Sequence, residues 1–238
     1  MDTHYTYLLV HLASLAGPLA LSFDKKVHFY KKWKYVFPSM LLSGLFFVCW
    51  DEYFTRSGIW GFNENYILGI FLGNLPLEEV LFFITVPYCC LFIYECIRSY
   101  FPDLKNRKWA DYILMTIAVI LLLSGAWHFQ KIYTACIFIL CAAFMTCIII
   151  FRNFFKSFDS APFLVSYLII LIPFLFVNGV LTAFPVVWYN DAETLGVRIF
   201  SFLPHPMQNI PFEDVIYGML LIMVNVAVYE RLKSSSKA

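Results

Sequence analysis

Long apolar segments separated by short polar loops make up most of this chain. Each segment approaches the roughly 20 apolar residues that a helix needs to cross a bilayer core of about 30 Å. The segments cover residues 5–22, 35–50, 76–97, 111–127, 131–151, 162–184 and 211–231. This pattern predicts an all-α integral membrane bundle of seven transmembrane helices.

Lysine and arginine gather in alternate loops. The first, third and fifth loops and the C-terminal tail are basic, whereas the other three loops together hold only Arg56, Lys131 and Arg198. Because basic loops remain in the cytoplasm, the alternation predicts a protein of the cytoplasmic (inner) membrane, with its N-terminus outside and its C-terminus in the cytoplasm. No basic region precedes the first apolar segment, so we expect a span there and not a removable signal peptide.

The composition excludes several classes of protein. Of 238 residues, 61% are hydrophobic and 14% are charged, and the net charge is +1, which fits a chain in contact with lipid and leaves no basic field for nucleic acid. Histidines and cysteines lack the spacing of metal ligands, and no glycine-rich nucleotide fingerprint is present. We therefore expect neither a metal nor a cofactor.

Two of the apolar segments begin and end alike. One opens with a Pro-Leu-Glu-Glu-Val sequence at residues 76–80, the other with Pro-Phe-Glu-Asp-Val at 211–215, and they end Tyr-Glu at 94–95 and 229–230. Upstream, Trp50 and Gly58 pair with Trp188 and Gly196 at equal spacing, and an acidic outer loop follows each Trp (Asp51 and Glu52; Asp191 and Glu193).

This duplication predicts an internal repeat. The third and seventh spans have the same parity, so the two repeats run parallel, and binding sites in such proteins lie where the repeats meet. We predict two parallel three-helix repeats, residues 1–97 and 131–238, joined by a connector helix within residues 98–130. The stretches 66–74 and 195–210 are too short or too broken to span, and we expect them to cap the acidic motifs.

The four motif carboxyls are the candidate catalytic groups. Carboxylates are costly in a membrane, and several close together hinder one another's ionisation, so a general acid can stand beside a general base. Glu78 and Glu213 are identical in the two copies and are expected to point inward, with Glu79 and Asp214 as the alternative. An ordinary helix-capping role remains open.

Other residues are weaker candidates. Trp60, Tyr88 and Tyr217 lie near the motifs and are candidates to line a hydrocarbon tunnel, where ring faces stabilise a cation; ordinary packing is the alternative. Asn225 lies beneath Asp214 at helical spacing, and Arg198 is expected to pair with a nearby acid. Glu95 and Glu230, about 25 Å from the motif, fit interfacial anchoring or a second site.

Together the doubled motif and its aromatic-rich spans resemble the membrane-integral lycopene cyclases. In that family the two repeats are separate subunits in some bacteria, are fused in other bacteria and in archaea, and precede phytoene synthase in fungi. The chain is similar to the fused form without a synthase. Residues 58–63 and Asn190-Asp191 also look like the family, which adds Asn63 to the candidate substrate-binding residues.

The resemblance implies an intramolecular lyase or isomerase. Protonation of the ψ end of lycopene, ring closure and loss of a proton would give β-rings, hence γ-carotene and β-carotene, without cofactor or redox change. Substrate and lipid bilayer are the implied partners. Ring type, number of rings, the assignment of acid and base, and oligomeric state, including a homo-oligomer, stay open. Alternatives are a carotenoid cyclase of other ring type or longer substrate, or a membrane transporter or receptor.

Overall fold

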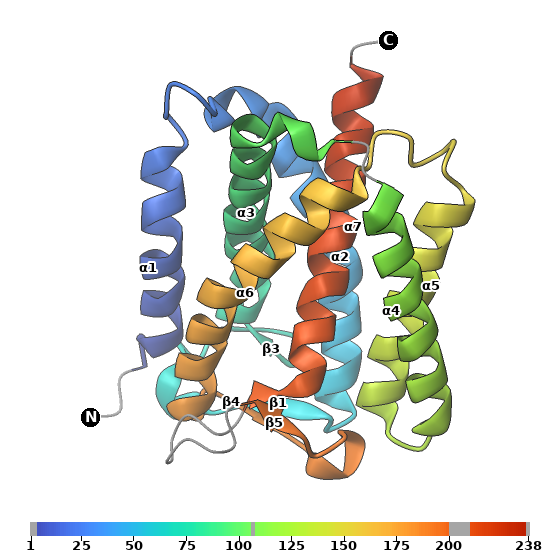
Figure 1. Cartoon of the computed structure of the whole chain (residues 1–238). Coiled ribbons are helices and arrows are strands. Elements are labelled where there is room, and N and C mark those ends of the chain that lie inside the picture. Colours follow the sequence, from blue (N-terminus) through green and yellow to red (C-terminus); the bar gives the residue numbers. More distant parts are fainter. Residues whose placement is uncertain (1–3, 106–107, 200–209, 237–238) are drawn as a thin grey trace.

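The computed structural model describes residues 4–105, 108–199 and 210–236, and these residues form a bundle of α-helices closed at one end by short β-pairs (Figure 1). The helices are α1 (Thr6–Leu21), α2 (Trp33–Arg56), α3 (Leu77–Tyr100), α4 (Lys108–Trp127), α5 (Ile132–Ile150), α6 (Ser160–Ala183) and α7 (Phe212–Ser235). Each of the seven predicted spans therefore overlaps one helix.

Six of the described helices, α2 to α7, are long and apolar enough to cross a membrane. The first, α1, is apolar but has 16 residues, or about 24 Å of helix. Exposed apolar side chains surround the bundle, for example Leu41 and Leu45 on α2 and Ile120 and Leu123 on α4, as expected for helices that face lipid. The fold is thus an all-helical membrane bundle, while a seventh crossing by α1 stays a prediction.

The second predicted span differs most from its helix. It was expected to end at residue 50, but α2 continues to Arg56. Asp51 is therefore not part of an outer loop: it lies within the helix and is buried. Asp51 and Glu52 end the apolar pattern at residue 50, but the helix continues for about one and a half further turns.

The helices pack in the same order in both halves of the chain. In the centre, α3 and α7 each contact α2 and α6, while α1 packs on α3 and α5 packs on α7. The remaining helix, α4, lies against α5 and touches α6 and stands at the side of the bundle in Figure 1. The division into two three-helix repeats and a connector stays a prediction.

Among the described residues, three antiparallel β-pairs close the end of the bundle where α3 and α7 begin (Figure 1). Two are local: β2 (Phe71–Leu72) with β3 (Leu75–Pro76), and β5 (Arg198–Ile199) with β6 (Ile210–Pro211). The third joins the halves, because β1 (Trp60–Phe62) pairs with β4 (Val187–Tyr189) and sets Gly61 opposite Trp188. A Cβ on Gly61 would clash with the Trp188 ring, so this close approach of β1 and β4 favours glycine.

The loops after β1 and β4 have the same local structure. Short 3₁₀ helices follow at Glu64–Tyr66 and Asp191–Glu193, and each is capped by an asparagine side chain that accepts a backbone N–H at 3.1 Å, Asn63 from Asn65 and Asn190 from Ala192.

Gly69 and Gly196 follow at the same spacing, with φ of 75° and 73°, values that favour glycine. The structure thus pairs Gly196 with Gly69, and the sequence-based pairing with Gly58 was wrong. Of the expected cap 195–210, residues 200–209 lie outside the described part of the chain.

Candidate active site

The four motif carboxyls lie in the first turns of α3 and α7. A short β-pair ends at Pro76 or Pro211, and the helix begins at the next residue. The free N–H groups of a first helical turn favour nearby negative charge. All four side chains are buried, so their partners decide what each can do.

Glu78 and Glu213 hold the preceding loops in place. Glu78 accepts the backbone N–H of Leu68 at 2.7 Å, and Glu213 accepts that of Leu195 at 2.6 Å and the hydroxyl of Thr134 at 2.5 Å. Both loop amides immediately precede the glycines with positive φ. The sequence favoured these two acids as the inward pair, yet neither of them lines the large cavity of the bundle.

Glu79 and Asp214 face that cavity, which has a volume of about 410 Å³. Each accepts a hydrogen bond from a tyrosine of a neighbouring helix in its own half. Tyr7 of α1 donates to Glu79 at 2.5 Å, and Tyr133 of α5 donates to Asp214 at 2.7 Å. Both carboxyls line this one cavity, near the first turns of α3 and α7. The two halves therefore bring one carboxyl each to the same end of one cavity.

Further polar groups complete this end of the cavity. The Asp51 carboxyl lies within hydrogen-bonding reach of Glu79 and accepts the hydroxyl of Tyr217 at 2.9 Å. Asp214 also accepts Asn178 Nδ2 at 2.7 Å and the Tyr189 hydroxyl at 2.8 Å. We call these eight residues the polar end of the cavity: Tyr7, Asp51, Glu79, Tyr133, Asn178, Tyr189, Asp214 and Tyr217.

The rest of the cavity is mainly apolar and elongated. On α3 its lining runs from Glu79 through Phe82 and Val86 to Ile93, a distance of about 21 Å along the helix. Pro18 of α1 and several side chains of α6 form the other walls. Such a cavity has room for an extended hydrocarbon chain whose end meets the carboxyls.

An apolar cleft of about 400 Å³ lies beside the cavity, between α1 and α6. The cleft and the cavity share four lining residues: Ala13, Ser14, Phe176 and Val177. Leu9 and Phe176 at the cleft are exposed on the side of the bundle. The cavity therefore continues toward the surface that would face lipid.

Of the other candidate residues, Trp60 and Tyr217 line the cavity. Tyr88 does not: its hydroxyl bonds Ser22 at 2.6 Å and accepts Trp33 Nε1 at 3.1 Å. Asn63 caps the first 3₁₀ helix, as described above. Asn225 accepts the Ser43 hydroxyl at 2.6 Å and so joins α7 to α2.

Arg198 forms an ion pair with Asp191, and its guanidinium lies 5.8 Å from the Tyr189 ring centre. Arg198 therefore lies beside a tyrosine of the polar end but does not itself line the cavity. Within the described ranges, no group of three histidine, cysteine or acidic side chains is placed to hold a metal ion.

Sequence reasoning missed five residues of the polar end: Tyr7, Asp51, Tyr133, Asn178 and Tyr189. One signal was available, because Asp51 and Asn178 are separated by 127 positions, the same offset that relates Asn63 to Asn190 and Leu68 to Leu195. Aligning the repeats at the asparagine caps would have set these residues opposite each other.

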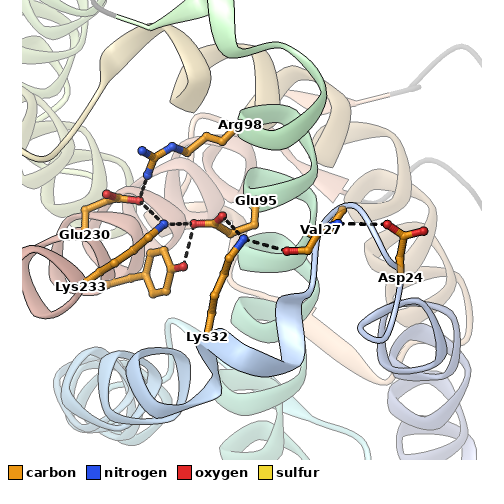
Figure 2. A network of polar contacts seen from close by, with 8 residues as sticks. Asp24, Val27, Lys32, Glu95, Arg98, Glu230 and Lys233 are labelled. Atoms are coloured by element: carbon orange, nitrogen blue, oxygen red, sulfur yellow. Dashed lines mark hydrogen bonds and ion pairs between the residues drawn. The ribbon is translucent and has the colours of Figure 1, made fainter. Parts of the chain in front are cut away.

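Glu95 and Glu230 form a separate network at the other end of α3 and α7 (Figure 2). Glu95 pairs with Lys32 at 2.6 Å and with Lys233 at 2.5 Å, and Glu230 pairs with Arg98. The two pairs between α3 and α7 are reciprocal, since each helix supplies one acid and one base. These pairs connect α3 and α7 at the end of the bundle opposite the polar end.

The network extends into the first loop (Figure 2). Lys32 donates to the carbonyl of Val27 at 3.0 Å. Backbone N–H groups of Lys26 and Val27 donate to Asp24, which holds the pKa of that carboxyl below its usual value.

Comparison with known proteins follows the same two halves. The family model described as "Lycopene cyclase" matches residues 4–97 and 130–232 and leaves out α4. A search among solved structures gave no match.

Curated relatives are fungal proteins named "Bifunctional lycopene cyclase/phytoene synthase". Those of Podospora anserina and Pyrenophora tritici-repentis are 31% and 34% identical over 96 residues, which is 38% of this chain and 16% of each relative. That of Aspergillus niger is 29% identical over 82 residues, or 32% of this chain and 14% of the relative. The chain thus matches only a small part of the curated relatives. Because the family model covers most of the chain on both sides of α4, the chain belongs to the lycopene cyclase family.

Proposed function

We propose that this protein is a carotenoid cyclase of the membrane, which closes rings at the ends of lycopene or a similar linear carotene. One observation carries the proposal: Glu79 and Asp214, one from each half, meet at the polar end of an elongated apolar cavity. A linear carotene is a hydrocarbon without polar groups. Its cyclisation therefore needs a proton donor and a proton acceptor in a site that excludes water.

The proposed reaction is redox-neutral. A carboxylic acid at the polar end protonates the terminal double bond of the ψ end and leaves a tertiary cation. The nearby double bond attacks that cation and closes a six-membered ring. A carboxylate then removes a proton and leaves the double bond of a β-ring. Among the cavity-lining rings, Trp60 and Tyr217 can present their faces to the cation.

The relatives support the cyclase activity through their printed name, which couples it to phytoene synthase; the matched part is 16% of the relatives from Podospora and Pyrenophora. The proposal takes over the cyclase activity alone. It also includes seven membrane crossings with the C-terminus in the cytoplasm, as the basic loops predict. The polar end would then lie toward the outer face of the membrane.

Expression in a lycopene-accumulating bacterium tests the activity. We expect conversion of lycopene to ringed products without added cofactor, measured by chromatography of the extracted pigments. Glu79→Gln and Asp214→Asn should each lower the yield of β-rings at least about 100-fold, because one proton transfer is lost in each.

Glu64→Gln is the matched control, since Glu64 is exposed at the same end of the bundle and its loss should leave the yield unchanged. Lycopene left unconverted by the intact protein would refute the enzymatic proposal. Unchanged β-ring yield in both cavity variants would refute the assignment of the site.

A further inference from the structure

The two cavity carboxyls occupy equivalent places but have unequal neighbours. Tyr7 and Tyr133 donate equivalent hydrogen bonds to Glu79 and Asp214. At the next equivalent place, α2 presents the Asp51 carboxyl to Glu79, whereas α6 presents the Asn178 amide to Asp214. Asp51 and Asn178 lie at equivalent positions of the two halves, and their side chains differ in one heavy atom, oxygen against nitrogen.

Near Glu79 this difference favours a bound proton. Each carboxyl of the Asp51–Glu79 pair receives one tyrosine hydroxyl, from Tyr217 and Tyr7 respectively. The pair is buried, Asp51 being 2% and Glu79 8% exposed, and neither carboxyl takes part in the ion pairs found among the described residues. Two buried carboxyls in contact resist double ionisation, so they hold one proton between them.

Near Asp214 the neighbours favour the ionised form. Three neutral donors point at its two oxygens: Tyr133 at 2.7 Å, Asn178 at 2.7 Å and Tyr189 at 2.8 Å. Burial and the adjacent Asp214 raise the pKa of Tyr189, which lies in β4 outside the helices, so this phenol stays protonated and donates. Hydrogen bonds donated to a carboxylate stabilise its charge.

We propose that Asp51 and Glu79 together store the proton given to the substrate, and that Asp214 is the base that takes a proton from the ring cation. This assignment of roles rests on the proposed cyclase function. Asp51 thereby becomes a third carboxyl of the reaction, although it lies outside both sequence motifs.

The proton balance closes within these three carboxyls. An O–H bond of the Asp51–Glu79 pair breaks, and the electron pair of the terminal C=C bond forms the new C–H bond. The electron pair of the second C=C bond forms the ring C–C bond. A ring C–H bond then breaks, its electrons form the ring double bond, and the proton passes to the Asp214 carboxylate. One proton is given and one is taken for each ring.

The titratable groups around the Asp51–Glu79 pair come from several elements. They are Tyr7 and His11 of α1, Glu78 of α3, Tyr189 of β4, and Asp214 and Tyr217 of α7. Of these, Glu78 accepts from a loop amide and Asp214 receives three donors, so Asp51 is the neighbour best placed to share the proton.

Reciprocal variants test the proposal. Asp51→Asn removes the second carboxyl beside Glu79, so activity at neutral pH should fall at least about tenfold and recover at lower pH. Asn178→Asp creates a carboxyl pair at Asp214, so activity should also fall but recover at higher pH. Asp51→Glu keeps a second carboxyl and should retain most activity. A merely structural role for Asp51 would not shift the two pH profiles in opposite directions.

Product analysis separates acid from base. Glu79→Gln should form no ring of any type, whereas Asp214→Asn should still form rings, with the double bond displaced because the proton leaves from another carbon. The reverse result, rings of altered type in Glu79→Gln and none in Asp214→Asn, would overturn the assignment.

Infrared spectroscopy of the purified protein provides a readout that does not depend on activity. Asp51→Asn and Glu79→Gln should each remove the band of a protonated carboxyl at neutral pH, and Asp214→Asn should not. Loss of the band only in Asp214→Asn, or a wild-type pH profile in Asp51→Asn, would refute the proton store. An intact protein that forms no rings but shows the expected bands would refute the proposed function alone.

Discussion

At the scale of single residues, neighbouring acids in one motif have different surroundings. Glu78 and Glu213 accept backbone N–H groups of the loops, whereas Glu79 and Asp214 face the cavity. Successive residues of a helix point about 100° apart, so a doubled acid always presents two directions. The motif identifies the four carboxyls, but the direction of each depends on partners that are distant in sequence.

We therefore expect Glu78→Gln to affect stability more than chemistry. A glutamine oxygen still accepts the Leu68 amide, but without charge, so the loss should be about 1 kcal/mol, with ring formation retained within roughly tenfold. Thermal unfolding in detergent and pigment analysis measure the two effects, with Glu79→Gln as the comparison. Loss of all ring formation in a folded Glu78→Gln protein would contradict this division of roles.

Much of the candidate site could be found in the sequence, and the remainder could not for a physical reason. Glu79 and Asp214 of the duplicated motif, together with Trp60 and Tyr217, line the cavity. Tyr7, Tyr133 and Asn178 carry no local signal, because each lies in an apolar helix that contains other uncharged polar residues as well. A charged residue such as Asp51 interrupts the apolar pattern whether or not it is buried. The sequence therefore predicts a loop at Asp51, although the residue is buried in α2.

At the scale of helices and strands, apolar length predicts the ends of every helix to within six residues, the largest difference being at the end of α2. The β-pairs are not predicted. Strands of two or three residues are too short to show a period of two. Their role is specific nonetheless: β1 and β4 join the halves, while β2–β3 and β5–β6 hold the prolines that immediately precede α3 and α7.

The reciprocal ion pairs of Figure 2 should contribute to the packing of α3 against α7. Arg98→Met leaves Glu230, whose side chain is 5% exposed, with Lys233 at 3.6 Å. Removing one partner of a largely buried pair should cost about 2–3 kcal/mol, somewhat below the fully buried case because Arg98 is partly exposed. Denaturant unfolding in detergent measures the loss.

Arg152→Met is the matched control, because the Arg152–Asp111 pair is more exposed and its loss should cost less than about 1 kcal/mol. The double variant Arg98→Met/Glu230→Leu should be less destabilised than Arg98→Met alone, since no buried charge is then left unpaired. Equal losses in Arg98→Met and Arg152→Met would contradict a specific role for the reciprocal pairs.

At the scale of the whole molecule, two similar halves form one unsymmetrical cavity. Equivalent loops, glycines and tyrosines relate the halves, yet the cavity lies mainly among α1, α3 and α6, and the cleft between α1 and α6 opens from it. Parity and duplication in the sequence predict the paired halves. They do not predict the asymmetry, which depends on side-chain packing between helices that are distant in sequence.

The cleft has a consequence for the order of events. A linear carotene is about as long as the bilayer core is thick, roughly 30 Å, whereas the cavity extends about 21 Å along α3. One end can reach the acids while the remainder leaves sideways through the cleft into the lipid. Both ends of a symmetrical polyene must then visit in turn, with a complete reversal of the molecule between visits. Monocyclic carotene should accordingly rise to a maximum before bicyclic carotene in a time course. Simultaneous appearance of both would show that the protein closes both rings without releasing the monocyclic carotene.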